Sequence, residues 1–145
     1  LTNHRSIDTS PSWSPDGKEI VFVSARSGSP QLWLMPLGGG TPRQLTTAGT
    51  YNQEPAWSPV PKSPWIAFTH QREQGGYDIW LINARTRATR RLTHRGSNKS
   101  PSWSPDGRWI LYTSSLGGLW VVRPDGRCSR RIYGGHGRTP AWSGF

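Results

Sequence analysis

The heptapeptide "PSWSPDG" occupies residues 11–17 and recurs unchanged at residues 101–107. Two variants, "PAWSPVP" at 55–61 and "PAWSGF" at 140–145, place the first Pro of successive copies 44, 46 and 39 residues apart. A second marker, Leu-Thr or Ile-Tyr, precedes each copy, at residues 1–2, 45–46, 92–93 and 132–133. An internal period of roughly 40–45 residues with β-type sequence is typical of β-propeller blades.

Each repeat contains four short strand-like segments separated by Gly, Pro, Asn and Asp. The first holds the repeated Trp, the second is apolar and β-branched, and the third carries another Trp. The second segments are "EIVFVS", "WIAFTH" and "WILYTS", starting at residues 19, 65 and 109, and the third are "LWLM", "IWLI" and "LWVV", starting at 32, 79 and 119. The fourth segments are "RQLT", "RRLT" and "RRIY". Four antiparallel strands per repeat predict an all-β fold of propeller blades.

The predicted organisation is one partial propeller domain over residues 1–145. It has three complete blade units, at about 11–46, 55–93 and 101–133, and an extra strand at 140–144. Three blades do not close a ring, because propellers typically have about four to eight blades. We expect these residues to be the C-terminal half of a longer chain. The alternative is that two copies pair into one six-bladed ring.

The "SPDG" part of the motif predicts a tight turn between the first and second strands, since Pro fixes φ and Gly supplies positive φ. Asp16 and Asp106 are therefore interpreted as turn formers and not as ligands or catalysts. The departure to "SPVP" at 58–61 predicts a looser hairpin in the second unit. The periodic tryptophans are expected to fill space between blades; stacking on nucleotides is the alternative reading.

The chain carries 18 Lys plus Arg against 8 Asp plus Glu, a formal net charge of +10. Either an Arg-rich codon bias or binding to an acidic partner explains this excess. No RNA-binding motif accompanies the arginines, which disfavours nucleic acid. Cys128 is the single cysteine, so no internal disulfide forms. No P-loop, GxSxG or HExxH motif is present. We therefore expect a protein that is not an enzyme and uses no cofactor.

The run "PSWSPDGKEIVFVSARSGSPQLWLM", followed by "GGTPRQLT", resembles the WD-related repeat of TolB-type propellers, as do the tracts "TYNQEPAWSP" and "TPAWSGF". The resemblance covers the whole chain and matches the C-terminal half of such a propeller. It implies a six-bladed ring in the bacterial periplasm that binds the lipoprotein Pal within the Tol-Pal system of the cell envelope. Tricorn-type and prolyl-oligopeptidase-type propellers use similar repeats. Two alternatives therefore remain: the gating propeller of a larger serine peptidase, or a structural subunit of an assembly.

Propeller function lies on the loops at the two faces, so the loops before each repeated Pro are expected to bind a partner protein. Polar and aromatic side chains mark these loops: Asp8, Tyr51, Asn52, Gln53, Glu54 and Asn98. The resemblance assigns Pal docking to this face, most directly at the "YNQ" tract. The alternative role for Asp8 and Asn52 is hydrogen bonding within their own loops.

A basic rim is predicted on the opposite face and on the outermost strands. It comprises Arg85, Arg87, Arg90, Arg91, Arg123, Arg127, Arg130 and Arg131. Cations on edge strands oppose edge-to-edge aggregation, and they also suit an acidic partner or an anionic envelope surface. The four histidines His4, His70, His94 and His136 fall in the partner-side loops. Their spacing is irregular, so we expect solvated histidines and no metal site.

Overall fold

The computed structural model describes residues 5–135 and 140–142 of the chain. Within these residues all regular structure is β-strand, arranged as three four-stranded antiparallel sheets, which confirms the predicted fold class. The first blade contains β1 (Asp8–Trp13), β2 (Glu19–Ser24), β3 (Gln31–Pro36) and β4 (Arg43–Gln44). The second contains β5 (Asn52–Trp57), β6 (Trp65–Gln71), β7 (Tyr77–Asn83) and β8 (Thr89–Arg91), and the third β9 (Asn98–Trp103), β10 (Ile110–Ser114), β11 (Leu119–Val122) and β12 (Arg130–Tyr133). The described residues include no helix that could span a membrane.

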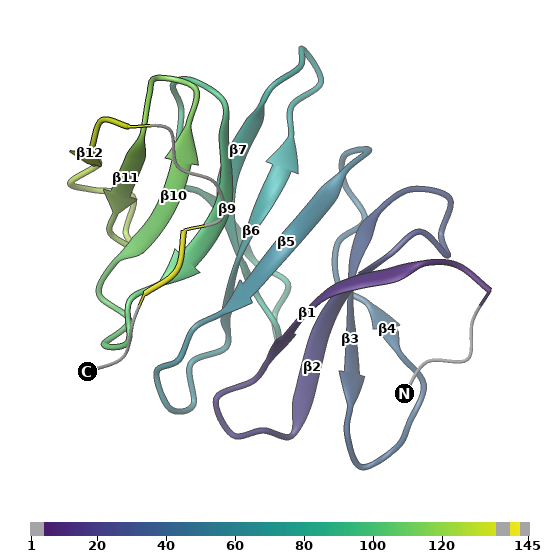
Figure 1. Ribbon diagram of the computed structural model, residues 1–145. Coiled ribbons are helices and arrows are strands. Elements are labelled where there is room, and N and C mark those ends of the chain that lie inside the picture. The colour runs from purple at the N-terminus through teal and green to yellow at the C-terminus, as the bar shows by residue number, and fades with distance from the viewer. Residues whose placement is uncertain (1–4, 136–139, 143–145) are drawn as a thin grey trace.

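Each blade is a simple meander whose strands pair in chain order, and the three blades stand side by side (Figure 1). The first strands of neighbouring blades contact one another, β1 with β5 and β5 with β9. Every blade therefore has two ends. We call the upper face the end formed by the β2–β3, β6–β7 and β10–β11 loops and by the connections between blades. The lower face carries the "SPDG" turns and the β3–β4, β7–β8 and β11–β12 loops.

The first strand of each blade begins earlier than expected, three residues before the repeated Pro. A β-bulge interrupts its pairing with the second strand. The residues before Pro11, Pro55 and Pro101 have left-handed backbone at the bulge, with φ of 52°, 53° and 56°. The expectation that loops extend up to each Pro was therefore wrong. The first strand pairs with the second strand both before and after the bulge. The partner-side polar residues from Asp8, Asn52 and Asn98 onward therefore belong to strands.

The repeated tryptophans pack between blades, as predicted. Trp57 is 6 % exposed and belongs to a core shared with first-blade residues such as Val21 and Leu34. Trp103 is 8 % exposed and packs on second-blade residues such as Leu81. Trp13, in the same motif, is 57 % exposed because no blade of this structure covers its side. Each ring thus belongs to the interface with the preceding blade.

The predicted extra strand at 140–144 is not found in its described part. Residues 140–142 have no strand structure, because no second strand of a further blade pairs with them; residues 143 and 144 lie outside the described residues. Trp142 nevertheless docks on the third blade, where its indole Nε1 donates a hydrogen bond to the carbonyl of Ser102 at 3.1 Å. In Figure 1 this yellow segment runs beside β9.

The "SPDG" turns are closed by their own side chains, which confirms the interpretation of Asp16 and Asp106 as turn formers. Asp16 Oδ1 accepts a hydrogen bond from the Ser14 hydroxyl at 2.6 Å and from the Lys18 amide at 3.1 Å. Asp106 makes the same pair of contacts with Ser104 and Arg108. The "SPVP" hairpin is longer, because its closing bond joins Ser58 to Trp65, whereas Ser14 joins Glu19.

These turns predict an acid-sensitive contribution to stability. The hydrogen bond from the Ser14 hydroxyl, with that from the Lys18 amide, lowers the pKa of Asp16 below its ordinary 3.8, and Ser104 does the same for Asp106. Because the folded-state pKa is lower than the unfolded one, the contribution is present above the unfolded pKa and is lost as pH falls through the folded pKa. We expect the double variant Asp16→Asn/Asp106→Asn to lose less stability than the parent between pH 5 and 2 in urea titrations. If the free energy of unfolding falls equally with pH in the two proteins, Asp16 and Asp106 do not make this contribution.

Candidate functional site

The six residues expected to bind a partner gather at the upper face and at the inner strands below it. Two of them, Asn52 and Asn98, are buried, each about 1 % exposed. Asn52 Nδ2 donates to Gln31 Oε1 at 2.7 Å and to the Ala48 carbonyl at 2.9 Å. Asn98 Nδ2 donates to the Arg95 carbonyl at 2.8 Å. These amides hold the connections between blades in place, and in this structure their side chains are not available for direct contact.

Glu54 and Asp8 also have partners within the chain. The Glu54 carboxylate accepts hydrogen bonds from the Thr69 hydroxyl at 2.7 Å, the Ser100 amide at 2.8 Å and the Ser100 hydroxyl at 3.1 Å. It therefore joins the second blade to the bulge of the third. Asp8 forms an ion pair with Arg26 at 2.9 Å, and this guanidinium lies over the rings of Phe22 and Trp33.

Tyr51 and Gln53 are the two predicted residues with half-buried side chains and no side-chain hydrogen bond among the described residues. The Tyr51 ring packs edge-on against Tyr77, with centroids 6.3 Å apart. The ammonium of Lys99 lies 3.9 Å from the centre of the Tyr77 ring. Gln53 and Lys99 stand at equivalent positions of β5 and β9, one residue after Asn52 and Asn98. We call Tyr51, Gln53, Tyr77 and Lys99 the upper-face patch.

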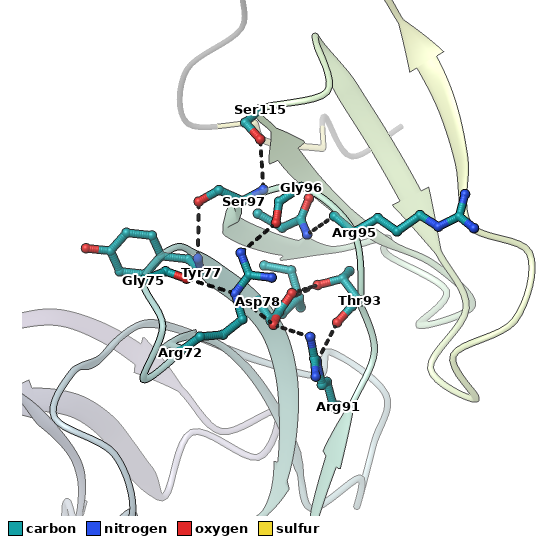
Figure 2. A network of polar contacts seen from close by, with 12 residues as sticks. Arg72, Gly75, Tyr77, Asp78, Arg91, Thr93, Arg95, Gly96, Ser97 and Ser115 are labelled. Carbon is teal, nitrogen blue, oxygen red and sulfur yellow. Dashed lines mark hydrogen bonds and ion pairs between the residues drawn. The ribbon is translucent and has the colours of Figure 1, made fainter.

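A polar network anchored on Asp78 supports this patch (Figure 2). The Asp78 side chain is fully buried, and its Oδ2 forms ion pairs with Arg91 at 2.8 Å and with Arg72 at 3.7 Å. Its Oδ1 accepts a hydrogen bond from the Thr93 hydroxyl at 3.1 Å. Arg72 in turn donates to the Gly96 carbonyl at 2.9 Å, beyond the end of β8. One carboxylate thus fixes the β6–β7 loop against the connection between the second and third blades.

The network continues towards the third blade through serine hydroxyls. The amide of Tyr77 donates to Ser97 Oγ at 3.1 Å, and the amide of Ser97 donates to Ser115 Oγ at 2.8 Å. Figure 2 shows these contacts as a continuous chain from Arg72 to the β10–β11 loop. The backbone of Tyr77 is therefore held by Ser97, and its ring packs against Tyr51 and Lys99. A rigidly held aromatic side chain loses little conformational entropy when it binds.

The sequence analysis missed Asp78, although a signal was present. A carboxylate in the apolar segment "YDIWLI" is unusual, because a buried charge needs a partner. The Leu-Thr marker supplies one of the partners of Asp78, the Thr93 hydroxyl. The hydroxyl of Thr46 accepts a hydrogen bond from the Leu32 amide at 2.9 Å, and Thr93 does the same for Ile79 at 2.9 Å. The marker therefore ties the fourth segment to the start of the third strand.

The predicted basic rim divides between two situations. In the second blade the arginines bind neighbouring blades: Arg85 pairs with Glu19, Arg87 Nε donates to the Leu45 carbonyl at 3.2 Å, and Arg90 donates to the Pro124 carbonyl at 3.2 Å. Arg91 belongs to the Asp78 network. In the third blade the side chains are exposed, and these are Arg123, Arg127, Arg130 and Arg131. Arg85, Arg87 and Arg90 of the second blade thus stabilise the packing of blades.

The histidines do not form a metal site in the part of the chain that is described. No three His, Cys, Asp or Glu side chains come together there. His4 and His136 lie outside the described residues, and His94 is exposed. His70 is half-buried, and its Nδ1 lies 2.7 Å from Asn52 Oδ1. Burial lowers the pKa of His70 below its usual 6.5, an effect that nearby Asp78 partly opposes.

Comparison with known proteins agrees with the geometry. The "TolB beta propeller domain" model matches residues 1–145. A TolB homologue of Chlorobium chlorochromatii is 42 % identical over 79 % of this chain and 25 % of its own length. The Tol-Pal system protein TolB of Bordetella pertussis is 35 % identical over 100 % of this chain and 34 % of its own.

Among solved structures, TolB from Acinetobacter baumannii superimposes with a TM-score of 0.82 at 32 % identity, over 97 % of this chain and 36 % of that one. The chain therefore spans about a quarter to a third of the length of the relatives named here. Three observations agree: the four-stranded blades, the inter-blade tryptophans and the family match over every residue. The chain belongs to the TolB β-propeller family.

Proposed function

We propose that this chain is part of an interaction module of the bacterial cell envelope and that its upper face binds a protein partner. The partner that we propose is a Pal-type lipoprotein, because relatives with 33 % and 35 % identity are described as Tol-Pal system proteins. A periplasmic location follows from the same proposal. We further propose that the module acts by binding alone and performs no catalysis.

The observation that supports this proposal best is the upper-face patch. Tyr51 and Tyr77 offer two half-buried rings, Lys99 adds a cation and Gln53 adds an amide. Aromatic residues held in place near the centre of an interface contribute most of its binding energy. The Asp78 network and the buried amides Asn52 and Asn98 hold this patch before a partner arrives. Less conformational entropy is then lost on binding.

The other predicted partner residues take supporting roles in this proposal. Glu54 and Asp8 position the inner strands through their hydrogen bonds and ion pair. From the predicted basic rim we retain the exposed arginines of the third blade as a second docking surface for an acidic partner. They are Arg123, Arg127, Arg130 and Arg131.

The test is a binding measurement between the full-length protein that contains these residues and the soluble domain of a Pal-type lipoprotein from the same cell. Tyr51→Ala is expected to weaken the affinity by about fivefold or more, because a central Tyr typically contributes over about 1 kcal/mol. Isothermal titration calorimetry measures the change. Val60→Ala is the control, since Val60 is exposed in the β5–β6 hairpin of the lower face, at the opposite end of the blade from the patch and outside both proposed docking surfaces. Equal losses in both variants would rule out the patch as the binding site.

A further inference from the structure

The upper-face patch carries a positive charge that the repeat itself does not require. Lys99 supplies this charge from the first strand of the third blade, where it pairs in register with the second strand. The residues that pair in the same way in the first and second blades are Thr9 and Gln53, and both are neutral. Blades therefore form without a cation at this position, and the charge of Lys99 calls for a reason outside the fold.

The ammonium group of Lys99 has no carboxylate partner within the described residues. It lies 3.9 Å from the centre of the Tyr77 ring, and it takes part in none of the ion pairs of the described chain. The face of an aromatic ring attracts a cation but does not neutralise its charge. Lys99 is therefore held in a defined place and can still pair with an anion.

Most carboxylates of the upper face are already engaged elsewhere. Asp8 and Asp78 form ion pairs with arginines, and both oxygens of Glu54 accept hydrogen bonds from neighbouring strands. Glu73 and Arg95 are exposed and form no ion pair in the described part of the chain. Figure 2 shows the Arg95 guanidinium turned away from the Asp78 network. Arg95 adds a second available cation to this part of the face.

Neutral hydrogen-bond donors accompany the ammonium group. The hydroxyls of Tyr51 and Tyr77 and the amide of Gln53 make no hydrogen bond among the described residues. Tyr51 packs edge-on against Tyr77, whose ring also carries the ammonium of Lys99, so three of these side chains form one contact cluster. An ionised Asp or Glu side chain offers acceptors only, and its methylene stem packs on an aromatic ring. The patch therefore matches an acidic side chain better than a basic one.

We propose that the partner presents an acidic segment to the upper face and that one of its Asp or Glu carboxylates binds Lys99 beside Tyr51 and Tyr77. This inference rests on the proposed function, because it specifies the chemistry of the segment that the patch binds. Complementary charges at an interface mainly speed association and select among partners. The two rings supply the packing of the contact, and Lys99 determines which segment docks there.

The test measures association rates by surface plasmon resonance, with the full-length protein and the immobilised soluble domain of a Pal-type lipoprotein from the same cell. Lys99→Glu is expected to slow association about tenfold in 0.1 M NaCl, because it replaces attraction by repulsion. In 1 M NaCl the Debye length falls from about 10 Å to about 3 Å, so the deficit should shrink to about twofold. Tyr51→Ala removes packing instead of charge, and its loss of affinity should persist at both salt concentrations.

Two further variants control for net charge and for folding. Lys62→Glu makes the same change of charge at an exposed Lys in the β5–β6 hairpin of the lower face, and it should slow association by about twofold or less. Lys99→Met keeps an unbranched stem on the Tyr77 ring and removes only the charge. It should slow association about threefold in 0.1 M NaCl, which tests the inference even if Glu at this position disturbs β9.

The outcomes separate this inference from the proposed function on which it rests. A loss of affinity with Tyr51→Ala but with neither Lys99 variant would overturn the inference and leave the proposed function standing. Equal slowing by Lys62→Glu and Lys99→Glu would also overturn it, since net charge would then account for the effect. A deficit of Lys99→Glu that is unchanged in 1 M NaCl would show a structural role and overturn it too. If no variant alters binding, the proposed function fails together with the inference.

Discussion

Replacing Trp103 with alanine is expected to lower the free energy of unfolding by about 3–5 kcal/mol, the cost of removing a large aromatic side chain from a core. The ring is 8 % exposed and packs on Ile79, Leu81 and Leu92 of the second blade. Its Nε1 also donates to the Ala56 carbonyl at 2.9 Å, so the variant leaves this oxygen without its partner. The loss is measured by urea unfolding of the purified 145-residue chain, from the change in midpoint at constant slope.

The chain supplies a matched control in the first copy of the same heptapeptide. Trp13 has identical neighbours in sequence, yet it is 57 % exposed in this structure. Trp13→Ala should therefore change the stability of the same 145-residue chain by about 1 kcal/mol or less, as for exposed substitutions in general. If both variants lose the same stability, the tryptophans stabilise their own turns and not the interfaces between blades.

These two tryptophans also show how much of the fold could be predicted from the sequence. The repeat "PSWSPDG" predicted blades, turns and tryptophans between blades, because periodicity in a sequence reflects contacts that recur in every unit. The motif carried no information on which Trp ring is buried, since the neighbouring blade, and not the motif, buries the ring. The second and third strands were placed to within one or two residues, because short continuous apolar runs bounded by turn residues mark buried strands. The bulges at Glu54 and Ser100 were missed because non-glycine residues rarely adopt left-handed backbone.

The candidate site was less predictable for a related reason. Tyr51 and Gln53 could be proposed as partner-binding residues from the sequence, because they stand in the "YNQ" tract just before a repeated Pro. Tyr77 and Lys99 were missed, since they come from different blades and meet only through the packing of β5, β7 and β9. Candidate residues within one tract could be predicted from the sequence, whereas contacts between site residues of different blades could not.

The Asp78→Asn variant is the sharpest probe of how the upper face is held together. Removing one member of a buried ion pair costs about 3–5 kcal/mol when the remaining charge stays buried. Here Arg91 and Arg72 are 34 % and 29 % exposed, so water partly compensates them. We therefore expect a loss near the lower limit, about 3 kcal/mol, in urea unfolding. Asp125→Asn is the control, since Asp125 forms an exposed ion pair with Arg123 at 4.0 Å that is worth about 0.5 kcal/mol or less.

The Asp78→Asn variant also distinguishes a role of Asp78 in ordering the upper face from a role in global stability alone. If Asp78 fixes the β6–β7 loop against residues 93–97, amide hydrogen exchange should accelerate at Tyr77 and Ser97, whose backbone lies in the network. Exchange in β2 and β3 of the first blade, which has the neutral Gln31 at the equivalent position, should change little beyond the loss of global stability. Uniform acceleration over all three blades would show that Asp78 contributes only to global stability. Acceleration confined to the upper face would show that one buried carboxylate keeps the backbone around Tyr77 in position.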